Sequence, residues 1–146
     1  MAGFLGKAPL TSDVGLLLEI VVIAILFFGR FGLARKKRIK EHAVLMLTAV
    51  VLHAASVLLI MIPSFEVYLI MIGFSGFFSP AMIITWIHAP AGSIALLLGG
   101  YLVVNWRFRS PAVACYKRNR LMRPLWWLWI FSLSLGLLIY ASIAFF

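Results

Sequence analysis

Four long apolar runs divide the chain, with polar or basic residues between them. The runs cover residues 14–34, 42–62, 81–106 and 125–146. Each exceeds the roughly 20 residues with which an α-helix crosses about 30 Å of hydrocarbon. The pattern therefore predicts an all-α integral membrane protein, in which one domain, residues 1–146, forms a four-helix transmembrane bundle.

The connection between the second and third runs is apolar but broken. We expect the second span to end at Pro63 and the third to begin after Pro80, because proline lacks the backbone N–H that continues a helix. Residues 64–79 between them carry Glu66 and two glycines, Gly73 and Gly76. They are too short for a clean fifth span, so the sequence predicts a short outer segment that is interfacial or re-entrant.

The composition supports the same class of protein. Hydrophobic residues make up 64% of the chain and charged residues 12%, whereas soluble domains average about 45–50% and about 25%. The single cysteine excludes a disulfide within the chain and a zinc or iron–sulfur cluster held by cysteines.

The positions of the basic residues predict the topology. The chain has 13 Lys and Arg against four acidic residues, which gives a formal net charge of +9. Twelve of the 13 basic residues lie in two segments, residues 30–40 and residues 107–123. Because basic loops remain on the cytoplasmic side, we expect a multi-pass protein of the cell membrane with both termini and the 63–80 connection outside. Topology accounts for the charge, so no nucleic-acid partner is required, and contact of these loops with anionic lipid is compatible with it.

Ionisable residues inside the spans are costly and are the first candidates for function. A rise of about 1.5 Å per residue, counted from the outer ends of the spans, places Glu19 about 9 Å deep, His53 about 13 Å and His88 about 12 Å. Three helices would therefore bring these groups to a similar depth in the outer half of the bundle. His42 lies elsewhere, at the cytoplasmic mouth of the second span.

One face of the third span carries a histidine followed by small residues. Gly92, Ala95 and Gly99 follow His88 at offsets of +4, +7 and +11, which share one side of a helix. Small residues at such spacings allow close helix packing, and beside an imidazole they also leave room for a flat macrocycle. With His53 opposite, the pattern predicts haem b held by two histidines, the alternatives being a non-haem metal or a structural hydrogen-bonded pair.

Two further groups have open roles. Glu19 is a candidate third ligand of a metal site, a hydrogen-bond acceptor for a ligating imidazole, a proton carrier, or a protonated carboxyl paired with a neighbour. His42 has Met46, Met122 and Cys115 as conceivable partners for a metal, and an interfacial histidine is the favoured interpretation.

Several catalytic motifs are absent from the sequence. It contains no Walker loop, no His-Glu-x-x-His and no Cys-x-x-Cys-His for covalent haem. It shows no inverted repeat of the kind that transporters carry. We therefore expect no enzymatic activity from the chain on its own.

Three short motifs carry a resemblance to a known family: Lys40-Glu41-His42-Ala43-Val44-Leu45-Met46, Trp86-Ile87-His88-Ala89, and residues 129–136 followed by Tyr140. They resemble a family of small four-helix membrane proteins, long of unknown function, whose CtaM-like members are implicated in the assembly of haem–copper oxidases. The resemblance spans about residues 13–142. It implies the four-helix fold and an assembly role, with His42 and His88 as family positions; Lys117-Arg118 stand where the family has a histidine.

Two functional hypotheses follow. The first is a small b-type cytochrome-like protein, with haem on His53 and His88 and with Glu19 tuning it, that acts in electron transfer or in a respiratory complex. The alternative is a non-catalytic assembly or accessory subunit of a haem–copper oxidase or another membrane metalloenzyme, binding copper or no cofactor. In either case the expected partners are the lipid bilayer and a larger membrane redox complex or a second copy of the chain.

Overall fold

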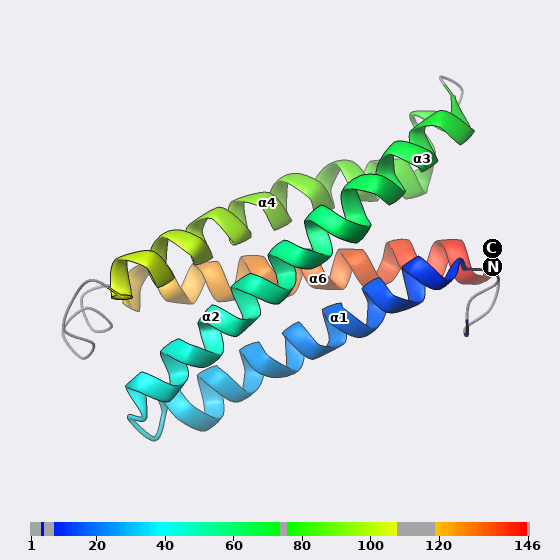
Figure 1. Cartoon of the computed structure of the whole chain (residues 1–146). Coiled ribbons are helices and arrows are strands. Elements are labelled where there is room, and N and C mark those ends of the chain that lie inside the picture. The colour runs from blue at the N-terminus through cyan, green and yellow to red at the C-terminus, as the bar shows by residue number, and fades with distance from the viewer. Residues whose placement is uncertain (1–3, 5–7, 74–75, 108–118, 146) are drawn as a thin grey trace.

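The computed structural model describes residue 4 and residues 8–73, 76–107 and 119–145, and every regular element in them is a helix (Figure 1). In chain order these elements are α1 (Leu10–Phe27), the π-helix η1 (Phe28–Ala34), α2 (Ile39–Ser56), the π-helix η2 (Val57–Met61), α3 (Ile62–Ile72), α4 (Pro80–Arg107) and α6 (Asn119–Phe145). They combine into four stretches long and apolar enough to cross a membrane: Leu10–Ala34, Ile39–Met71, Pro80–Asn105 and Arg120–Ala144. The predicted four-helix transmembrane fold is thus confirmed.

The second span is longer than the sequence predicts. Pro63 does not end it, because this proline lies in the first turn of α3, directly after η2. A π-helical turn changes the hydrogen-bond register of the backbone, so a residue without an N–H is tolerated there. Residues 64–72 therefore continue as helix instead of turning back into the membrane. The chain turns only at Gly73, whose φ of 56° is a conformation that glycine adopts at low cost.

The continuous α2–η2–α3 helix is too long for the bilayer core. Its 33 residues from Ile39 to Met71 measure about 50 Å, against about 30 Å of hydrocarbon. In Figure 1, α3 diverges from α1 at the end of the bundle where both chain termini lie.

The spans pack antiparallel in a closed ring. α1 packs on α2, α2 on α4, α4 on α6, and α6 returns to α1, with α4 and α6 forming the most extensive pair. Glycine allows the closest approaches. A Cβ on Gly99 of α4 would lie only 2.9 Å from the Trp129 ring of α6, and a Cβ on Gly29 of η1 would overlap the methyl group of Met46 in α2.

The buried polar residues concentrate in one half of the bundle, whereas buried apolar residues occur along its whole length. The buried apolar cluster gathers toward the end with the η1–α2 turn and consists of Val22, Leu26, Ala49, Ala95, Leu125, Trp126, Trp129 and Leu133. The buried polar residues lie toward the end with the termini or at mid-span: Asp13, Glu19, His53, Ser56 and Ser132. The outside of the bundle is apolar, with side chains such as Leu59 and Leu97 more than 70% exposed, as expected for a surface in contact with lipid.

Candidate functional site

Glu19 and His53 meet at the centre of the bundle. Glu19 projects from α1 and His53 from α2, and the two residues are 4% and 1% exposed. His53 Nδ1 lies 3.6 Å from Glu19 Oε1, which is longer than a hydrogen bond. Neither oxygen of Glu19 and neither ring nitrogen of His53 has a hydrogen-bond partner among the described residues. Because burying such atoms without partners is costly, this pair is the strongest candidate site in the molecule.

The other two helices complete the surroundings of His53. A Cβ on Gly92 of α4 would lie 4.0 Å from His53 Nε2 and 3.0 Å from the Ser132 hydroxyl of α6. The Trp129 ring meets His53 edge-on, with ring centres 5.6 Å apart. Trp129 Nε1 and the hydroxyl of Ser56, one turn from His53, also have no partner within the part of the chain that the structure describes. The centre therefore combines a carboxyl, an imidazole, a hydroxyl and an indole N–H with unused hydrogen-bonding capacity.

His88 makes a different contact. Its Nδ1 lies 2.9 Å from the main-chain oxygen of Ser132. Because a carbonyl oxygen only accepts, Nδ1 carries the hydrogen and Nε2 carries the lone pair. The ring packs on α6 one turn beyond Ser132, where a Cβ on Gly136 would lie 3.2 Å from His88 Cε1.

The two histidines have different partners. His53 faces Gly92, which is four residues further along α4 than His88, and His88 contacts Ser132, whose hydroxyl also lies against Gly92. The structure thus brings His53 to Glu19 and His88 to the backbone of α6.

His42 stabilises a π-helix. Its Nδ1 lies 2.9 Å from the carbonyl oxygen of Gly29 in η1. The imidazole N–H donates to this carbonyl and so fastens the start of α2 to η1. Met46, one of its conceivable metal partners, packs on the same glycine, whereas Cys115 lies outside the described residues.

The small-residue face of α4 is covered by α6. Gly92 lies against Ser132 and Gly99 against Trp129, and Ala95 is completely buried. This is the close helix packing that the sequence left open as an alternative. A haem ring on this face requires α6 to move away from α4.

The donors that meet at the centre suit a small ligand. Glu19 and His53 offer a carboxylate and an imidazole, which together can hold a proton or contribute two ligands to a cation. Among the described residues, no three His, Cys, Asp or Glu side chains gather as a metal-holding group.

A second polar contact ties the ends of α1 and α6. Asp13 accepts a hydrogen bond of 2.6 Å from the Tyr140 hydroxyl and another from the backbone N–H of Phe4. Sequence reasoning missed this tie and the roles of Ser56, Ser132 and Trp129. The only available signal was that Ser56 follows His53 by three residues and so shares its helix face.

No family model, curated protein or solved structure matches this chain.

Proposed function

We propose that this protein is a non-catalytic accessory or assembly subunit of a membrane redox complex, and that Glu19 and His53 hold an exchangeable proton within its bundle. One observation carries the proposal: a carboxyl and an imidazole lie 3.6 Å apart, almost fully buried, with all four polar atoms unpartnered. The resemblance to assembly proteins of haem–copper oxidases supports the accessory role, and the proposal needs no cofactor in the chain itself.

A shared proton suits the energetics of this pair. An isolated charge in the bundle would cost several kcal/mol to desolvate. One proton shared by Glu19 and His53 keeps the pair net neutral, whichever group holds it. A carboxylic acid O–H can then donate to the imidazole, which requires the two groups to approach by less than 1 Å, about one rotamer adjustment.

The polarity of the bundle favours exchange from one side. Three polar groups lie between the pair and the end of the bundle with the termini: the carboxyl of Asp13 and the hydroxyls of Tyr140 and Ser56. The apolar cluster fills the other half of the bundle. With the basic loops cytoplasmic, as proposed from the positive-inside rule, the proton is exchanged with the outer side.

Infrared difference spectroscopy on the purified protein tests the proton site. We expect the C=O stretch of a buried, protonated carboxyl that responds to pH, is absent from Glu19→Gln and is shifted in His53→Gln. Glu66→Gln is the matched control, because Glu66 is exposed, and it leaves the band unchanged. A carboxyl band insensitive to Glu19→Gln would contradict the proposal. So would the absence, between pH 5 and pH 9, of both a protonated carboxyl and an imidazolium band that is lost in His53→Gln.

A haem bound by His53 and His88 is the second candidate function. The observation that favours it is the hydrogen bond from His88 Nδ1 to the Ser132 carbonyl, the second-sphere contact that orients a ligating histidine and frees its Nε2. A visible spectrum of oxidised and dithionite-reduced protein, with metal analysis, separates the candidates. A Soret band that is lost in both His53→Ala and His88→Ala, but kept in His42→Ala, would show that the protein is a cytochrome and would refute the proton site. Stoichiometric copper lost in Glu19→Gln and His53→Ala would assign the pair to a metal.

A further inference from the structure

The turn between η1 and α2 contains the only non-glycine residue with a positive φ among the described residues. Lys37 has φ 59°. Its N–H bonds to the Ala34 carbonyl at 3.2 Å, and the Arg38 N–H bonds to the Leu33 carbonyl at 3.1 Å. This hydrogen-bond pair is the Schellman motif, in which glycine is strongly preferred at the position that Lys37 occupies. A lysine at this position costs about 1 kcal/mol of stability relative to glycine. The side chain of Lys37 differs from glycine chiefly in its positive charge, so we expect a partner for that charge.

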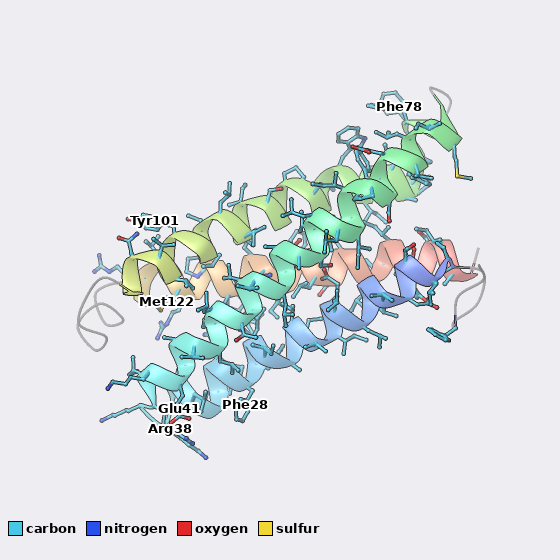
Figure 2. The ribbon with its side chains drawn as sticks, in the orientation of Figure 1. Phe28, Arg38, Glu41, Phe78, Tyr101 and Met122 are labelled. Atoms are coloured by element: carbon cyan, nitrogen blue, oxygen red, sulfur yellow. The ribbon has the colours of Figure 1, made fainter. Side chains whose placement is uncertain are left out.

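The turn stands at the mouth of a groove between the end of the first span and the start of α2. The floor of the groove is apolar and consists of Phe28, Leu33, Val44 and Leu45. Arg38, Lys40 and Glu41 line its polar rim. Figure 2 shows Phe28, Arg38 and Glu41 gathered at this end of the molecule. Phe28 is 60% and Val44 57% exposed, so the floor opens onto the lipid-facing surface of the bundle.

The rim is strongly positive. Residues 35–41 hold five basic side chains and one acidic one. The acidic residue, Glu41, accepts a hydrogen bond of 2.7 Å from Arg38 Nε and so fixes the guanidinium at the rim. Lys40 lines the same rim, and Lys37, which precedes Arg38 in the chain, is exposed. An apolar floor that continues into a basic rim at the end of a membrane span matches the two parts of a phospholipid, an acyl chain and an anionic headgroup.

We propose that this groove binds one anionic phospholipid, with the headgroup phosphate on Lys37, Arg38 and Lys40 and an acyl chain along Phe28 and Val44. The proposal does not depend on the proton site, which lies at the centre of the bundle. The occupant is a lipid because the floor is part of the lipid-facing surface, where a water-soluble anion or an acidic peptide would leave the apolar groove unfilled.

Native mass spectrometry of the detergent-purified full chain tests the site, with dioleoylphosphatidylglycerol and dioleoylphosphatidylcholine as probes. Each basic side chain near a headgroup contributes about fivefold in affinity. We therefore expect Arg38→Gln with Lys40→Gln to weaken phosphatidylglycerol binding by about 25-fold and to leave phosphatidylcholine binding unchanged. The matched control is Arg120→Gln with Arg123→Gln, which removes two exposed charges from the start of α6 and changes binding by less than about twofold. Equal losses in the two double variants would overturn the site.

Two further variants separate headgroup, acyl chain and fold. Lys37→Gly relieves the backbone strain while removing the charge, so we expect a higher melting temperature together with about fivefold weaker phosphatidylglycerol binding. A more stable variant with unchanged lipid binding would refute the role of this charge. Val44→Trp fills the floor, and we expect it to weaken phosphatidylglycerol binding with the charges intact. Inorganic phosphate that displaces the lipid fully at equal concentration would reassign the groove to a free anion.

Discussion

Replacing Gly99 by alanine tests how closely α4 and α6 pack. The added Cβ would lie 2.9 Å from Cζ3 and 3.2 Å from Cη2 of Trp129. Both atoms belong to one rigid ring that is itself 3% exposed within the apolar cluster, so the ring cannot move aside without disturbing its neighbours. Overpacking of this kind costs about 1–3 kcal/mol, and the gain in helix propensity from glycine to alanine offsets up to about 1 kcal/mol. We expect a net loss of about 1–2 kcal/mol.

The neighbouring glycine provides the matched control. Nothing lies within 4 Å of a Cβ built on Gly100, so Gly100→Ala gains propensity without a clash and should stabilise the protein by about 0.4–1 kcal/mol. Thermal unfolding in detergent, followed by Trp fluorescence and circular dichroism, measures both variants. If Gly99→Ala were as stable as Gly100→Ala, Trp129 would not pack on this face of α4. The part of the small-residue face around Gly99 would then be open, which removes one obstacle to the haem hypothesis.

Three further variants test the polar contacts. Tyr140→Phe should destabilise the protein, because Asp13 loses a part-buried hydrogen bond. If the two residues act as a pair, Tyr140→Phe should cause no further loss in an Asp13→Asn background. Glu19→Leu and His53→Leu should each cost about 3–5 kcal/mol, and the double variant should recover most of that loss. Additive losses in the double variant would show that the two groups do not interact. His42→Ala should cost about 0.5–1.5 kcal/mol by removing its hydrogen bond to the Gly29 carbonyl, and it should leave the infrared carboxyl band unchanged, whereas a shift of that band would connect the two sites.

The four spans were predictable because hydrocarbon thickness fixes the length of an apolar run. The continuation of the second helix through Pro63 was not, because it depends on a π-helical turn, which has no sequence signature of its own.

The candidate site was predictable in part for a related reason. Glu19 and His53 stand out because ionisable groups are rare inside apolar spans. Glu19 and His53 can pair only if α1 and α2 turn the right faces toward each other. Apolar runs with weak periodicity do not determine this orientation of the helices. Ser132 and Trp129 carry no charge and occur in an aromatic, serine-containing stretch, so nothing in the sequence separates them from residues that face lipid.

The apolar cluster that fills one half of the bundle has an electrical consequence. Glu19 is the tenth of the 25 residues in its span, so a charge that reaches it from the end with the termini crosses at most about two fifths of the membrane. The larger share of any transmembrane voltage falls across the apolar cluster. One elementary charge that crosses the whole membrane at 100 mV changes its free energy by about 2.3 kcal/mol. Two fifths of that free energy changes the proton occupancy of the Glu19–His53 site up to about fivefold. A proton held by Glu19 and His53 would therefore be bound or released as the membrane potential changes, without any helix having to move.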